Sequence, residues 1–241
     1  MPWRTLPGLA LAVISLLAVV PERQTPVPST SRLSENGAAL AEAIRSHDLD
    51  SVRRLARVQA VLKEPVTSRG YSALSLAVKE GNAIIIRVLL AAGADVNMRD
   101  ANRGENGETP LGHAIERDDF LVAKLLLDAG ADPNLRFAGS TPLGYAAYLG
   151  AGNSVLALLR QGAVVDVRSP QLLEEGREKI QLTPLMVAAC MSHDAVVRTL
   201  LEHNADPLLT TADGETALTL AGRCSNPLQS TLSALRKALQ K

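Results

Sequence analysis

Apolar residues along the chain recur in short helical segments that are separated by polar turns. Four segments begin with Ser or Thr, then a small residue or proline, then Leu. They are Ser72-Ala73-Leu74, Thr109-Pro110-Leu111, Thr141-Pro142-Leu143 and Thr183-Pro184-Leu185, with a weaker version at Thr216-Ala217-Leu218. Ser and Thr are good helix N-caps, and proline at the first helical position costs no backbone hydrogen bond. The pattern therefore predicts that a short helix begins at each of these places.

A second helix is expected after each of the first four starts. Each of these helices carries a pair of leucines: Leu89-Leu90, Leu126-Leu127, Leu158-Leu159 and Leu200-Leu201. Gly93, Gly130, Gly162 and Asn204 then follow 21 residues after the respective helix start. Glycine tolerates the left-handed conformation that commonly ends a helix best, and asparagine tolerates it second best. A fixed offset in four copies indicates an internal repeat.

The repeats are unevenly spaced. Their starts lie 37, 32, 42 and 33 residues apart, whereas the offset inside each repeat does not change. The additional residues must therefore lie in the connections, at Arg99 to Gly107 and at Arg168 to Gln181. Such a segment can contribute to a binding surface or can be a tolerated insertion, and the role of the 168–181 insertion stays open.

These residues resemble the ankyrin repeat, most clearly in Gly93-Ala94-Asp95-Val96-Asn97 and Gly130-Ala131-Asp132-Pro133-Asn134. The resemblance covers about Ser34 to Lys241. It implies an all-α solenoid of helix-turn-helix units with short β-fingers, five to six repeats including caps, and a concave binding face. The expected units are about 34–66, 67–99, 104–135, 136–168, 178–210 and 211–241. The first and last units keep the apolar pattern but lose the turn motifs, as is expected of caps.

The N-terminal segment differs from the repeats. Residues 1–20 carry Arg4 and then an apolar run from Leu9 to Val20, and residues 21–33 are rich in Pro and Ser. A short basic region before about a dozen apolar residues is typical of an export signal. The pattern favours a cleaved signal and a periplasmic protein. The alternative is an uncleaved anchor in the inner membrane, with residues 21–33 as a flexible linker in both cases.

Composition narrows the function classes. The formal net charge is +0, with 25 basic and 25 acidic residues, so the chain has no basic excess for nucleic acid or an anionic membrane. Contact with a membrane is expected only through an uncleaved N-terminal segment. Aromatic residues make up 2% of the chain, which suits thin layers of short helices better than one large core.

No motif along the chain indicates catalysis. The four histidines fall at different positions of different repeats, without a metal-ligand spacing. His113 is expected to be a hydrogen-bonded structural residue, and Asp95, Asp132 and Asp206 are expected to bond the local backbone in turns. We therefore expect no catalytic residue, cofactor or metal. Cys190 and Cys224 are expected to be free thiols, because stacked helices lie about 10 Å apart, and a disulfide remains the alternative.

The resemblance implies that a partner binds at the finger tips and at the late part of each first helix. The expected partner-binding residues at these positions are Tyr71, Phe137, Tyr148, Leu149, Ile180 and Met191. Aromatic and aliphatic side chains in solvent-facing positions are typical of an interface. The predicted function is a monomeric, non-enzymatic scaffold that binds another protein. The alternatives are an inhibitor, immunity or accessory protein for a secreted or periplasmic enzyme, and a membrane-anchored structural adaptor.

Overall fold

The computed structural model describes residues 34–101, 107–137, 139–171, 180–223 and 229–240. The expected export signal or anchor at 1–20 and the linker at 21–33 lie outside the described residues. Among the residues that are described, no helix is both long and apolar enough to cross a membrane.

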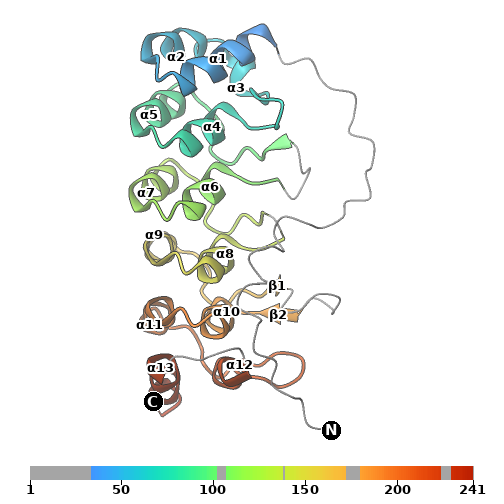
Figure 1. Ribbon diagram of the computed structural model, residues 1–241, viewed down its shortest axis with the longest axis vertical. Helices are drawn as coiled ribbons and strands as arrows, with labels where there is room; N and C mark the ends of the chain where they lie inside the picture. Colours follow the sequence, from blue (N-terminus) through green and yellow to red (C-terminus); the bar gives the residue numbers. More distant parts are fainter. Residues whose placement is uncertain (1–33, 102–106, 138, 172–179, 224–228, 241) are drawn as a thin grey trace. The chain divides into compact units, whose positions relative to one another are not determined.

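Pairs of short helices follow one another along the chain (Figure 1). The first helix of each pair joins an inner row, which consists of α1 (Glu35–Arg45), α4 (Ala73–Glu80), α6 (Pro110–Glu116), α8 (Pro142–Leu149), α10 (Pro184–Cys190) and α12 (Ala217–Arg223). The second helix joins an outer row, which consists of α2 (Leu49–Leu55), α5 (Ala83–Ala91), α7 (Phe120–Asp128), α9 (Gly152–Arg160), α11 (Asp194–Glu202) and α13 (Gln229–Ala238). Each inner helix packs against the next inner helix along the chain, so the repeats stack in sequence order.

The predicted N-caps form as the sequence indicates. Each of the helices α4, α6, α8 and α10 begins with a side-chain cap. The capping hydroxyl accepts a hydrogen bond from the backbone N–H three residues later, and it belongs to Ser72, Thr109, Thr141 and Thr183, respectively. The outer helices end at residues with positive φ, which are Gly93 (89°), Gly130 (93°), Gly162 (80°) and Asn204 (64°). The expected left-handed cap is thus confirmed at all four positions, including the one that asparagine occupies.

The turns that follow the outer helices link neighbouring repeats. Asp95, Asp132 and Asp206 each accept a hydrogen bond from the backbone N–H two residues later, which confirms their expected role in turns. Asn97 then accepts from the backbone N–H of Asp132 at 2.9 Å, and Asn134 accepts from that of Val164 at 2.9 Å. In the turns at Asp95 and Asp132, the aspartate therefore shapes the turn, and the asparagine two residues later holds it to the next turn.

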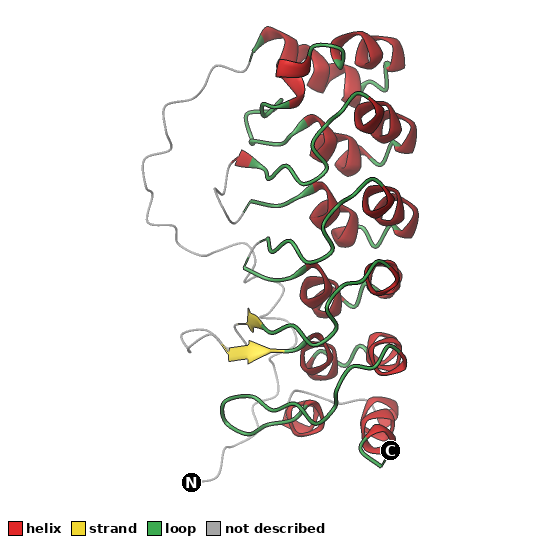
Figure 2. Cartoon of the chain, turned by 180° about the vertical axis from the view of Figure 1, so that it is seen from behind, coloured by secondary structure: helices red, strands yellow, loops and turns green. Residues whose placement is uncertain are grey.

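The fingers project on the side of the inner row (Figure 2). In the longest connection, β1 (Ser169–Gln171) pairs antiparallel with β2 (Ile180–Leu182), and Ser169 lies opposite Leu182. The expected insertion thus begins and ends in a two-stranded ribbon, whereas residues 172–179 lie outside the described residues. A further short helix, α3 (Gln59–Leu62), ends the first unit and was not predicted.

The core is a continuous apolar layer between the two rows. Leu89, Leu126, Leu158 and Leu200, one from each outer-helix leucine pair, are completely buried. At the ends of the stack, Leu40 and Val52 are buried in the first unit and Leu235 in the last. Burial of a leucine stabilises a fold by about 1.5–3 kcal/mol, so each layer depends on its neighbours for stability.

Cys190, at the end of α10, is disulfide-bonded, so the expectation of two free thiols is wrong. No cysteine that the structure describes is free. The chain's other cysteine, Cys224, follows α12 in the sequence and lies outside the described residues. The spacing of about 10 Å applies to helix axes. Helices α10 and α12 are direct neighbours, and side chains that project between packed helices approach more closely than the axes do.

Candidate protein-binding surface

The inner helices and fingers of the second and third repeats surround a buried imidazole. The His113 side chain on α6 has no exposed surface, and its Nε2 lies 2.7 Å from a carboxylate oxygen of Asp100, which is 1% exposed. On the other side of the ring, Nδ1 lies 3.2 Å from an oxygen of Glu108 and 3.3 Å from an oxygen of Glu116. The expectation that His113 is a hydrogen-bonded structural residue is confirmed, but its carboxylate partners were not foreseen.

Three segments bring these groups together. Asp100 and Glu108 stand at the two ends of one finger, which a hydrogen bond from the Asp100 N–H to the Glu108 carbonyl closes at 2.8 Å. The Thr109 cap then starts α6, so His113 and Glu116 follow one turn apart on the same helix. Asp100 also accepts from the Ser72 N–H at 3.4 Å, which ties the finger to the preceding repeat.

The carboxylates decide the charge of the imidazole. Burial lowers the pKa of His113, but the hydrogen bonds to Asp100 and Glu116 and the charges of Asp100 and Glu108 outweigh burial and raise this pKa to about 9. The hydrogen bond to His113 in turn lowers the pKa of Glu116. In the isolated chain, His113 is therefore a buried cation at neutral pH that neutralises part of the carboxylate charge.

Aromatic side chains border the charged cluster. The half-buried Tyr71 ring meets the His113 ring edge-on with centroids 5.6 Å apart, and the Lys79 ammonium lies 5.2 Å from the Tyr71 centroid. On the next repeat, the Tyr145 hydroxyl donates to Glu116 at 3.2 Å. Burial raises the pKa of both Tyr145 and Tyr148 above the ordinary value for tyrosine.

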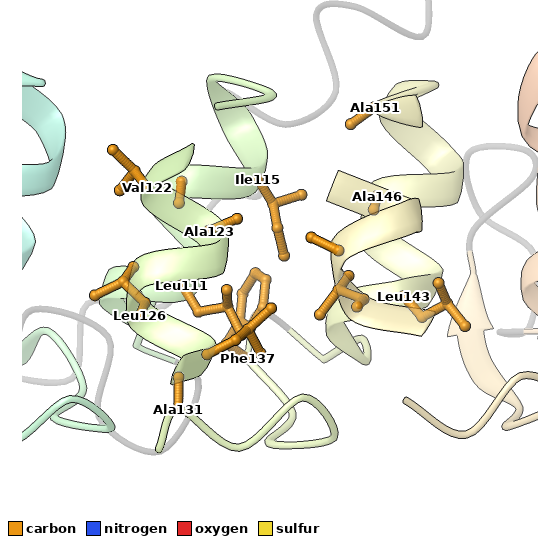
Figure 3. Packing of buried hydrophobic residues seen from close by; sticks show 14 of the residues in the cluster. Leu111, Ile115, Val122, Ala123, Leu126, Ala131, Phe137, Leu143, Ala146 and Ala151 are labelled. Atoms are coloured by element: carbon orange, nitrogen blue, oxygen red, sulfur yellow. The ribbon is translucent and has the colours of Figure 1, made fainter. Parts of the chain in front are cut away.

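Phe137 was expected to face a partner, and this expectation is wrong because its side chain is 1% exposed. The ring lies between the α6 and α8 layers, beside Leu111 (Figure 3). A Cβ atom at Gly112 would lie 3.0 Å from the Phe137 ring, and Tyr145 meets that ring edge-on at 5.3 Å. The absence of a side chain at residue 112 therefore leaves room for the phenyl group in the core.

The remaining predicted residues have different environments. Tyr148 and Met191 are half-buried against the core, and Leu149 is 37% exposed. They lie at the ends of the adjacent inner helices α8 and α10, where the His193 Nε2 lies 3.0 Å from the Tyr148 carbonyl oxygen. The Ile180 side chain lies outside the described residues. The structure thus places Tyr148, Leu149 and Met191 on one edge of the inner row.

Other exposed apolar residues were missed by the sequence analysis. Leu121 on α7 is 74% exposed and Ile84 on α5 is 61% exposed, and each is the second residue of its outer helix. Helical spacing did not identify them, because an apolar residue in the first turn of a short helix can point to either side.

Comparisons with known proteins place this arrangement in a family. Residues 99–169 match a model of three ankyrin repeats, and residues 69–101 and 181–212 each match a single ankyrin repeat. The chain belongs to the ankyrin repeat family. Its matched repeats contain α4 to α11 and the whole charged cluster around His113.

A curated mouse protein, Protein phosphatase 1 regulatory subunit 27 from Mus musculus, is 36% identical to this ankyrin chain over 76 residues. The match covers 32% of this chain and 47% of the mouse protein, so it spans about half of the length of that relative.

Proposed function

We propose that this ankyrin protein is a non-enzymatic scaffold that binds another protein through its inner helices and fingers. The observation that carries the proposal is that partly accessible tyrosines of the second and fourth repeats contact charged side chains of the third repeat, which lies between them. Tyr71, Tyr145 and Tyr148 are half-buried, so each has a fixed position and still presents surface. Tyrosines of this kind are enriched among residues that dominate binding energy.

The contacts around these tyrosines support a surface that is organised before binding. Tyr71 packs against His113 and beneath Lys79, and Tyr145 is held by Glu116. A side chain that is already ordered loses less conformational entropy when a partner binds. The name of the mouse relative describes a regulatory subunit, and regulation by a subunit is exercised through binding, which agrees with this role.

We further propose that the protein works outside the cytoplasm, in the periplasm. The apolar run at Leu9 to Val20 supports export, and the disulfide at Cys190 suits an oxidising compartment. An inhibitor, immunity or accessory protein of an exported enzyme would be one specific form of such a scaffold. A membrane-anchored adaptor is the alternative, and N-terminal sequencing of the mature protein distinguishes the two, because an adaptor retains residues 1–20.

The binding surface is tested by the double substitution Tyr148→Ala and Met191→Ala. Each change is expected to weaken partner binding by about 2 kcal/mol, the scale of a residue at an interface centre. The tagged full-length chain is captured from the exported fraction of its host, and the co-purified proteins are quantified by mass spectrometry. The expected partner is enriched by the parent and lost by the double variant, while both melt at similar temperatures.

Leu121→Ala on the outer row is the matched control, because it also removes an accessible apolar side chain. It is expected to retain the partner. If every protein enriched by the parent is also retained by the double variant, the proposed surface is wrong.

A further inference from the structure

The exposed side of the outer row carries arginines in the first two units of the stack. Arg53 and Arg54 lie on α2, Arg57 follows that helix, and Arg87 lies on α5. All four residues are exposed to solvent. Together they form the arginine face.

Two hydrogen bonds hold α2 and α5 side by side in the outer row (Figure 1). Before the two helices, the Asn82 side-chain amide donates to His47 Nδ1 at 2.9 Å. After them, the Gln59 side-chain amide donates to the Ala92 carbonyl oxygen at 2.8 Å. Because the segments are joined at both ends, the two helices run in the same direction. The arginines of α2 therefore lie alongside Arg87 on α5.

Acidic residues of the two helices neutralise only part of this positive charge. Helix α5 carries none, and the carboxylate of Asp50, the one acid on α2, lies 3.6 Å from the Arg53 guanidinium. Arg54 donates to a serine hydroxyl at 3.2 Å. Within the described part of the chain, Arg57 and Arg87 belong to no ion pair. The arginine face therefore keeps guanidinium groups that carboxylates of this chain do not engage.

Two basic residues farther along the outer row differ from the arginine face, because an acid on the same helix pairs with each of them. The Lys124 ammonium on α7 pairs with the Asp128 carboxylate. The Arg198 guanidinium on α11 lies 2.9 Å from the Asp194 carboxylate. An arginine without such a partner is available to a carboxylate of another molecule.

An exposed apolar residue and a hollow adjoin the arginine face. Ile84 on α5 is 61% exposed. It borders an open hollow of about 410 Å³, which His47 and residues 80–83 also line. The acids at this edge are Glu80 in the hollow and Asp48, which caps α2. An exposed apolar residue beside charged groups is typical of a protein interface, and the hollow admits a protruding side chain that a flat bilayer does not offer.

We propose that the arginine face and Ile84 bind an acidic segment of a second protein partner. A planar guanidinium donates two parallel hydrogen bonds to one carboxylate, so a segment that contains Asp or Glu complements the arginines. An apolar side chain of the same segment occupies the hollow beside Ile84. This surface belongs to the outer row, whereas the tyrosines belong to the inner helices and fingers, so one scaffold can hold two proteins at the same time.

The test uses the full-length protein and a displayed library of random peptides at physiological salt concentration. Peptides that bind the double variant Arg54→Ser and Arg87→Ser are removed first, and the parent then selects from the remainder. The selected peptides are expected to combine Asp or Glu with an apolar residue. A fluorescent copy of the most enriched peptide is expected to bind the double variant, and also Ile84→Ser, at least about tenfold more weakly than the parent.

Two controls test the specificity of this binding. Arg198→Ser removes the arginine at the equivalent position of α11, and this variant should bind the peptide like the parent. A peptide of the same composition in scrambled order should bind the parent at least about tenfold more weakly, because paired charges across an interface fix the register of the partner. Circular dichroism of each variant verifies the fold.

Three results would overturn the proposal: selection of no peptide, selection of peptides without acidic residues, and equal binding of the scrambled peptide. Binding of the parent to vesicles of phosphatidylglycerol and phosphatidylcholine, if the double variant loses it, would also overturn the proposal, because the arginine face would then serve a membrane. None of these results concerns the binding surface tested by Tyr148 and Met191.

Discussion

At the residue scale, burial decides which aromatic side chains remain for binding. Tyr71, Phe137 and Tyr148 occupy similar finger and helix-end positions in the sequence pattern, yet only Phe137 is buried. The cause is Gly112, whose missing side chain leaves room for the phenyl ring beneath α6. The position of a residue within its repeat is therefore not enough to assign its role, because packing against the neighbouring repeat decides whether the side chain is exposed.

Phe137→Ala tests this assignment. Because the ring is 1% exposed and lies between two layers, its loss is expected to lower the free energy of unfolding by about 3–5 kcal/mol. Urea denaturation followed by circular dichroism measures the change. Leu149→Ala, which removes a side chain that is 37% exposed, should cost much less. Equal stability of Phe137→Ala and the parent would show that the ring does not belong to the core.

At the element scale, helix ends are stabilised across repeats as well as within them. The N-cap residue of the outer helix α9 is Ala151, whose side chain cannot accept a hydrogen bond from the helix. Asp118 of the preceding repeat replaces it, because its carboxylate accepts from the Ser154 N–H at 2.8 Å. Asp118 itself has a φ of 47°, a conformation that asparagine and aspartate tolerate better than most residues.

Two substitutions of Asp118 are expected to show how much its capping bond and its tolerance of positive φ together contribute to stability. Asp118→Asn keeps an acceptor and tolerates positive φ, so its stability should stay close to that of the parent. Asp118→Ala loses both, at an expected cost of about 1–2 kcal/mol in the free energy of unfolding. Chemical denaturation of both variants measures the difference. The capping role would be refuted by an alanine variant as stable as the asparagine variant.

At the scale of the whole molecule, the stack is held by contacts between neighbouring repeats, and the disulfide adds a covalent link near its C-terminal end. A disulfide mainly restricts the unfolded chain. Helix α10, which carries Cys190, contacts α8 on one side and α12 on the other. The disulfide therefore constrains a part of the stack whose stability comes from contacts with the neighbouring repeats.

Cys190→Ser is expected to lower the free energy of unfolding by about 2–4 kcal/mol, the usual contribution of a native disulfide. Thermal unfolding of the parent under oxidising and reducing conditions gives the same comparison without a substitution. The variant should be insensitive to reductant, whereas the parent should lose stability on reduction. A parent whose melting temperature is the same in both conditions would contradict a structural role for the disulfide.

The sequence by itself determined the repeat, the helix starts at Ser72, Thr109, Thr141 and Thr183, and the left-handed ends at Gly93, Gly130, Gly162 and Asn204. These features depend on residues a few positions apart, and local backbone chemistry dictates them. Tertiary structure alone decided that Phe137 is buried, that Cys190 is bonded and that Asp100, Glu108 and Glu116 meet at His113. Each of these outcomes depends on side chains from different segments or repeats, and their distances are set by how one layer packs on the next.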